Sequence, residues 1–128
     1  MRKVAVVAAM AASLTIGGVG VASPAAAVTY HPYSKSITGA SVSGHWWDEG
    51  GRTYIDGYLK DTACDGGNSY FLARFSSKAT ADRVNNTQGC NTSKYFRFSA
   101  ATASDLDIKL GAQNWPIWDR NTGWIDIK

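Results

Sequence analysis

The sequence has few of the side chains that hydrolases commonly use for acid–base catalysis. Glu49 is the only glutamate among the 128 residues, and His31 and His45 are the only histidines. The G-x-S-x-G motif that presents a serine nucleophile does not occur. Because general acid–base chemistry depends on such groups, the sequence favours a protein that is not an enzyme, with a hydrolase as the less favoured alternative. We expect no catalytic residue.

Only one long apolar run occurs in the sequence, from Val4 to Val21. Arg2 and Lys3 precede it, and a proline and small residues follow it in the segment 23–27. This order of a basic segment, an apolar segment and an A-x-A cleavage site is typical of a secretory signal peptide. A membrane anchor is the alternative, since the run approaches the length of a membrane-spanning helix. We expect residues 1–27 to be cleaved off, which makes the mature chain secreted, extracellular and free of the membrane.

Clusters of lysine and arginine are also missing, although the formal net charge is +3. Without Arg2 and Lys3, 11 of the 13 basic residues remain beside 10 acidic residues, so the mature chain carries a net charge of +1. Binding to the phosphates of nucleic acid requires a row of basic side chains. We therefore expect no nucleic-acid partner.

Cysteine is scarce, and the two that occur are Cys64 and Cys90. They form no C-x-x-C motif and have no neighbouring histidine, which argues against a redox pair or a metal site. In an exported protein, two cysteines predict a disulfide. A bridge that closes a loop of about 26 residues stabilises the fold by roughly 3 kcal/mol in the chain-entropy model.

The segment 61–68 combines Asp61, Asp65 and Asn68 with two glycines, and such oxygen donors suit calcium. It lacks the ligand order and the terminal glutamate of an EF-hand. A hairpin turn next to Cys64 explains the same composition. We expect no metal and no cofactor, and calcium binding by this loop is the open alternative.

Apolar and polar residues alternate with a period of two along much of the mature chain. The segments with this pattern are 41–47, 54–60, 70–75, 95–98, 106–110 and 124–128. Such alternation predicts half-buried strands, and only Ser77 to Val84 allows a short helix. We therefore predict an all-β fold, a small antiparallel β-sandwich of six to seven strands that spans residues 40–128.

The Asp65-Gly66 turn signal predicts a hairpin that joins the strand 54–60 to the strand 70–75. A symmetric register sets Tyr58 opposite Tyr70 and Tyr54 opposite Arg74. The other face then carries apolar residues, and Gly57 opposite Phe71 leaves room for the phenyl ring. The predicted core residues of this hairpin are Ile55, Leu59, Phe71, Ala73 and Phe75.

All 15 aromatic residues lie in the mature chain, more than a small core requires. Tyrosine, tryptophan and arginine are enriched at binding hot spots, although a tryptophan can also simply close the end of a sandwich. We predict two binding clusters. One is the sheet face with Tyr54, Tyr58, Tyr70 and Arg74, and the other is the turn with Trp115 and Trp118.

The stretch 28–39 has little periodicity but contains Tyr30, His31 and Tyr33. We predict an extended N-terminal arm that docks into a partner's groove or pairs with its sheet edge. A frayed terminus without a role is the alternative.

The export signal, residues 54–62, the Asp65-Gly66 turn and Tyr70 together resemble small secreted β-sandwich proteins of actinobacteria. In size and export the chain is similar to the adaptor subunits of Streptomyces umbrella toxin particles. This resemblance implies a protein that joins a lectin subunit to a repeat-bearing toxin subunit, with residues 28–35 as the arm.

These observations together predict a secreted, non-enzymatic binding module, an adaptor between proteins in an extracellular complex such as an antibacterial toxin. The first alternative is a carbohydrate-binding module, in which Trp115 and Trp118 stack on sugar rings. The second alternative is an exported hydrolase inhibitor that uses the loop bridged by Cys64.

Overall fold

The structure, a computed structural model, describes residues 27–114 and 117–128. These residues form nine strands and no helix, which confirms the predicted all-β fold. The strands are β2 (His31–Ile37), β3 (Ala40–Glu49), β4 (Arg52–Asp61), β5 (Asn68–Phe75), β6 (Asp82–Asn86), β7 (Ser93–Ala101), β8 (Leu106–Asn114), β9 (Trp118–Asn121) and β10 (Ile125–Asp126). Among the described residues, none belongs to a helix that could cross a membrane. Apart from Ala27, the predicted signal peptide lies outside the described residues.

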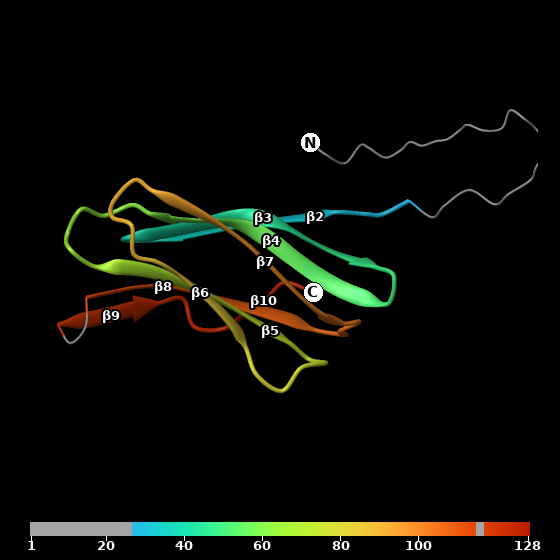
Figure 1. The fold of residues 1–128 in the computed structure, drawn as a ribbon. Coiled ribbons are helices and arrows are strands. Elements are labelled where there is room, and N and C mark those ends of the chain that lie inside the picture. The colour runs from blue at the N-terminus through green and yellow to red at the C-terminus, as the bar shows by residue number, and fades with distance from the viewer. Residues whose placement is uncertain (1–26, 115–116) are drawn as a thin grey trace, which may run out of the picture.

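Two antiparallel sheets pack face to face as a sandwich (Figure 1). The first sheet has the order β2-β3-β4-β7. The second has the order β10-β8-β5-β6, and β9 pairs with the C-terminal half of β8 beside β10. The structure has more strands than the predicted six or seven, because β2, β6 and β9 pair at sheet edges without a long alternating pattern.

The core lies between the two sheets, where the inward residues of central strands meet. Ile55 and Leu59 project inward from β4, and Phe71 and Phe75 project from β5. The inward residues of β8 are Leu106, Ile108 and Leu110, and all of them are fully buried. Each such side chain contributes about 1.5–3 kcal/mol on burial, and a slip of one residue in register would expose the whole set.

A row of four residues on the inner face of the first sheet determines how that sheet packs. Tyr33, Gly44, Gly57 and Phe96 are successive cross-strand partners from β2 to β7. A Cβ atom at Gly57 would lie 2.7 Å from the Tyr33 hydroxyl, and one at Gly44 would collide with the carbonyl oxygen of Asp56. Gly44 therefore allows close approach of the β4 backbone, and Gly57 makes room for Tyr33, which lies inside the fold with 8% of its surface exposed.

The predicted hairpin between β4 and β5 is wrong, because these strands belong to different sheets. β4 already has two partners, β3 and β7, so the segment after Asp61 crosses to the second sheet instead of turning back. The apolar residues predicted for one face of the hairpin do point into the core, but those of β4 and those of β5 face each other from opposite sheets. Gly57 accommodates Tyr33 and not Phe71.

The helix considered for Ser77 to Val84 is also not formed. Turns cover this stretch, and β6 pairs with β5 from Asp82. Val84 and Asn86 alternate inward along β6 and are both buried, which is the period of a strand.

The predicted free arm is wrong for residues 31–37. They form β2, which pairs with β3 along its whole length. The physical reason is Tyr33, whose ring is part of the core cluster and is stacked at 6.1 Å from Phe71 of the opposite sheet. The sandwich therefore begins at residue 31 and not at residue 40.

The predicted disulfide between Cys64 and Cys90 is confirmed, with 4.7 Å between the Cα atoms. It joins the segment that crosses between the sheets to the loop between β6 and β7. Next to it, the buried Asn86 donates hydrogen bonds from its amide nitrogen to the carbonyl oxygens of Leu59 and Thr92. This end of the sandwich is therefore held by one covalent and two polar cross-links.

Replacement of Gly44 by alanine tests the role of the glycine row. The Cβ atom collides with backbone, so Gly44→Ala should lower the free energy of unfolding by about 1–3 kcal/mol, the range for overpacking. Urea unfolding followed by tryptophan fluorescence measures this effect. Ser43→Ala, on the exposed side of the same strand, should stay within about 0.5 kcal/mol. Equal stability of both variants would contradict the account of the row.

Candidate functional site

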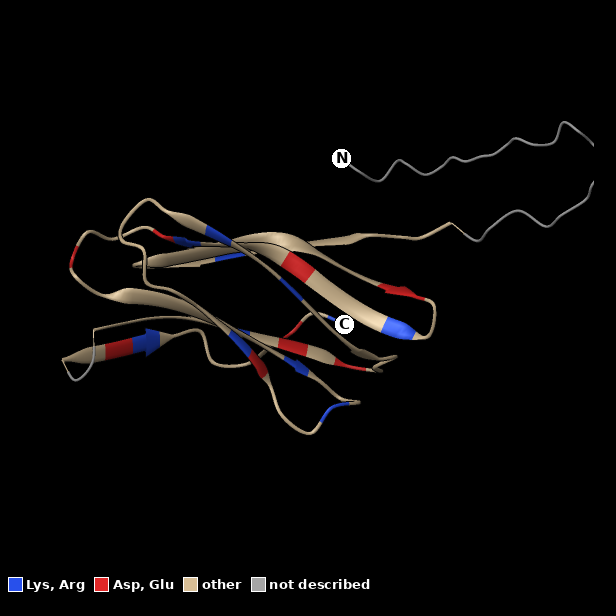
Figure 2. Cartoon of the chain, viewed as in Figure 1, with Lys and Arg blue, Asp and Glu red and all other residues tan. Residues whose placement is uncertain are grey.

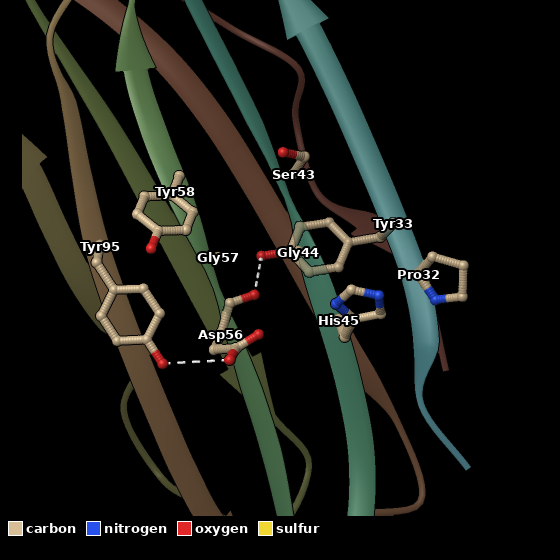
Figure 3. Close-up of a pocket in the computed structure, with 9 residues that line it drawn as sticks. All are labelled: Pro32, Tyr33, Ser43, Gly44, His45, Asp56, Gly57, Tyr58 and Tyr95. Carbon is tan, nitrogen blue, oxygen red and sulfur yellow. Dashed lines mark hydrogen bonds between the residues drawn. The ribbon is translucent and has the colours of Figure 1, made fainter. Parts of the chain in front are cut away.

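The outer face of the first sheet contains an open pocket of about 560 Å³, which we call the tyrosine pocket (Figure 3). Its size lies within the range of about 300–1,000 Å³ that is usual for small-ligand sites. The pocket is lined by Pro32, Tyr33, Ser43, Gly44, His45, Asp56, Gly57, Tyr58 and Tyr95. All four strands of the sheet contribute to it, so the sheet register alone brings these residues together.

Two neighbouring cross-strand rows supply the outward side chains of the pocket. One row runs through Pro32, His45 and Asp56 to Arg97 on β7. The other runs through Ser34, Ser43, Tyr58 and Tyr95. Side chains in such rows lie on one face of a sheet and within reach of each other.

Tyr58 and Tyr95 are the most exposed tyrosines of the site. Their side chains are 57% and 49% exposed, and their ring centroids lie 5.3 Å apart at an interplanar angle of 58°. Exposed rings that are tilted toward each other in a pocket are well suited to receive an apolar or cationic group.

Asp56 supplies the carboxylate of the pocket and is held from two sides. The Tyr95 hydroxyl donates a hydrogen bond to its carboxylate at 3.2 Å, and the Tyr33 hydroxyl donates one to its backbone carbonyl at 3.0 Å (Figure 3). Burial and then the charge of Asp56 raise the pKa of Tyr33 far above its ordinary value. The same two causes, in the same order, raise the pKa of Tyr95. Both phenols therefore remain protonated donors at neutral pH.

An aromatic stack adjoins the tyrosine pocket on the same face. Trp47 lies between Tyr30 and Tyr54, with centroid distances of 5.1 Å to each. The guanidinium carbon of Arg97 lies over the rings of Trp47 and Tyr54, at 5.1 and 5.7 Å from their centroids. Trp47 is thereby buried although it points outward, and Tyr54 has a partner within the chain.

The predicted cluster of Tyr54, Tyr58, Tyr70 and Arg74 is divided between opposite sides of the sandwich. The separation of β4 and β5 into two sheets is the reason. Tyr70 lies on the second sheet, nearly buried, and donates a hydrogen bond to Asp119 at 3.0 Å. Its ring fills the space above Gly111.

Arg74 is engaged on that same outer surface of the second sheet. It forms a 2.7 Å ion pair with Asp107 and lies 4.0 Å from the ring centroid of Trp124. Like Tyr70, it makes its contacts within the chain.

The remaining predicted site residues also have partners in the fold. His31 stacks on Trp46 at 4.1 Å, and Trp118 packs against the core under Arg120. Trp115 lies outside the described residues. Ile117, 73% exposed, is the most exposed large apolar side chain near this turn.

Sequence reasoning missed Asp56, Tyr95, His45 and Pro32 as site residues. The alternation in 95–98 places Tyr95 on the outer face of the strand and its neighbour Phe96 on the inner face, so the exposure of Tyr95 could be predicted. Its neighbours were not readable, because they depend on the pairing of β7 with β4 across nearly 40 positions.

Charge is dispersed over the molecule. Figure 2 shows basic and acidic residues interspersed along the strands of both sheets. Within residues 27–114 and 117–128, no three His, Cys, Asp or Glu side chains gather in a way that could hold a metal ion. In the 61–68 loop, the carboxylates of Asp61 and Asp65 accept hydrogen bonds from the backbone of Ala63 and Gly67.

Comparisons with known proteins found no matching family model, no matching curated protein and no matching solved structure.

Lys128 links the C-terminal end of the chain, marked C in Figure 1, to Asp48 of the first sheet. The Lys128 ammonium donates to both carboxylate oxygens of Asp48 at 2.8 Å and lies 5.2 Å from the Trp46 ring centroid. Desolvation raises the pKa of Asp48, but hydrogen bonds from Lys128 and Thr53 outweigh it, so the pKa is lowered overall.

This ion pair predicts acid-sensitive stability. An aspartate with a lowered pKa stabilises the fold above its ordinary pKa, and the contribution is lost as pH falls through the lowered value. Asp48→Asn should therefore be less stable than the parent chain at pH 7, by no more than about 1 kcal/mol for a partly exposed pair. The difference should shrink below pH 4, as thermal unfolding across pH will show. A difference that is constant with pH would contradict this role.

Proposed function

We propose that this chain is a secreted, non-enzymatic protein-binding module that acts as an adaptor in an extracellular complex and binds its partner with the tyrosine pocket. The observation that carries the proposal is the exposed pair of Tyr58 and Tyr95 beside the Asp56 carboxylate. Exposed tyrosines next to polar groups are typical of binding hot spots. The disulfide is consistent with an oxidising, extracellular setting.

An adaptor needs a second contact, and the edge strand β2 can provide it. Within the described residues β2 pairs with β3 on one side only, which leaves its other side for strand addition. The resemblance to umbrella toxin adaptors implies that an extended N-terminal arm makes this contact. Residues 31–37 of that arm form the edge strand β2, so we assign the contact to this strand.

A carbohydrate-binding module is the second candidate. Trp118 packs against the core, so Tyr58 and Tyr95 would take over the stacking on a sugar ring. Their exposed faces and the adjacent carboxylate favour this candidate over an inhibitor loop at Cys64.

Affinity capture from culture supernatant with the immobilised secreted chain tests the proposal. The double variant Tyr58→Ala/Tyr95→Ala should bind a stoichiometric protein partner roughly 30-fold or more weakly, since hot-spot side chains contribute about 2 kcal/mol or more. Ile117→Ala removes an exposed apolar side chain elsewhere and should leave capture unchanged. Quantitative mass spectrometry of the eluate provides the measurement.

Two results would contradict the proposal. Capture of the same partner by the parent chain and the double variant would show that the tyrosine pocket is not the interface. Retention on insoluble polysaccharide that is lost in the double variant would favour the carbohydrate module instead.

A further inference from the structure

Six aromatic rings within the described parts of the chain lie under a basic side chain of the same chain. A lysine ammonium or an arginine guanidinium lies over the ring at 4.0 to 5.7 Å from its centroid. The rings with such a cation are Trp46, Trp47, Tyr54, Tyr70, Trp118 and Trp124. The contacts occur on both sheets, so a cation of the chain covers aromatic rings on each side of the sandwich.

Tyr58 and Tyr95 have no such cation. Among the described residues, no lysine or arginine lies over either ring, although these are the most exposed tyrosines. Each ring contacts the other and keeps a face toward solvent. The pair therefore presents exposed, electron-rich ring faces that no lysine or arginine of the described residues covers.

The carboxylate of Asp56, which lies next to these rings, likewise forms no ion pair with a lysine or arginine. The three such ion pairs within the described parts of the chain involve Asp48, Asp82 and Asp107, and Asp56 belongs to none of them. A hydrogen bond from Tyr95 leaves acceptor capacity on its two oxygens.

The nearest basic residue in register is directed elsewhere. Arg97 is the cross-strand partner of Asp56, yet its guanidinium lies over Trp47 and Tyr54. The Arg97 guanidinium therefore covers the aromatic stack, and toward the tyrosine pocket it acts only through its charge, which partly offsets the rise in the pKa of Tyr95.

We propose that the tyrosine pocket receives a basic side chain, an arginine or a lysine, from the protein partner. The cation would pack against Tyr58 and Tyr95 and donate hydrogen bonds to the Asp56 carboxylate. This inference rests on the proposed function and specifies the chemistry of the partner. A carboxylate flanked by two tyrosine rings complements a cation in charge and shape.

Titration with small probes, followed by amide NMR spectra of the isotopically labelled chain, tests this chemistry. The probes are Nα-acetyl-arginine methylamide, Nα-acetyl-glutamate methylamide and methyl glucoside. The arginine probe should shift the amide signals of Asp56, Tyr58 and Tyr95, and the glutamate probe and the glucoside should not.

Two variants separate the parts of the pocket, and a third serves as the control. Asp56→Asn should weaken binding of the arginine probe about ten-fold or more, since hydrogen bonds between charged groups are among the strongest. Tyr95→Phe keeps the ring and should bind within about three-fold of the parent chain. Asp105→Asn removes an equal charge from an exposed loop position and should have no effect.

The outcomes separate this inference from the proposed function. Shifts with the glucoside alone, or no shifts with any probe, overturn the inference. If the partner is captured equally by the parent chain and Asp56→Asn but lost with Tyr58→Ala/Tyr95→Ala, the proposed function stands and the basic side chain is excluded. If capture is unchanged in all variants, the proposed function fails, and the arginine titration alone decides whether the pocket takes a cation.

Discussion

The row of Tyr33, Gly44, Gly57 and Phe96 is the constraint on which the first sheet depends. Gly44 lets the backbone of β4 approach closely, and Gly57 leaves space that the Tyr33 hydroxyl occupies from the edge strand. Phe71 of the opposite sheet then packs 4.7 Å from Phe96 and 6.1 Å from Tyr33. One aromatic layer thus connects both edges of the first sheet to the second.

The same row determines the position of the candidate site. The hydroxyl of Tyr33 reaches the backbone carbonyl of Asp56, so an inward side chain fixes the strand position from which the Asp56 carboxylate points outward. Pairing of Gly57 with Gly44 and Phe96 also sets Tyr58 beside Tyr95 on the other face. The inward residues of the core and the outward residues of the pocket therefore depend on the same strand register. A shift in register that exposed Tyr33 would also separate the residues of the pocket.

Local patterns predicted the fold class and the burial of Ile55, Leu59, Phe71 and Phe75, because alternation is visible within short segments. The disulfide could be predicted because two cysteines allow only one pairing. Local patterns could not predict which strands pair. A turn signal at Asp65-Gly66 describes a bend equally well within one sheet or between two sheets. Consequently Tyr58 and Tyr70, expected to be neighbours, lie on opposite surfaces, and Tyr33, expected in a free arm, is buried. Both differences arise from contacts between residues far apart in the chain.

The distribution of cations over aromatic rings leads to the central claim, that the tyrosine pocket accepts a basic side chain from a protein partner. A crystal structure of the chain soaked with Nα-acetyl-arginine methylamide tests it most directly. The claim predicts the guanidinium against Tyr58 or Tyr95 and within hydrogen-bond distance of the Asp56 carboxylate. A probe seated only on the second sheet, or an empty tyrosine pocket in crystals that leave it open to solvent, would contradict the claim.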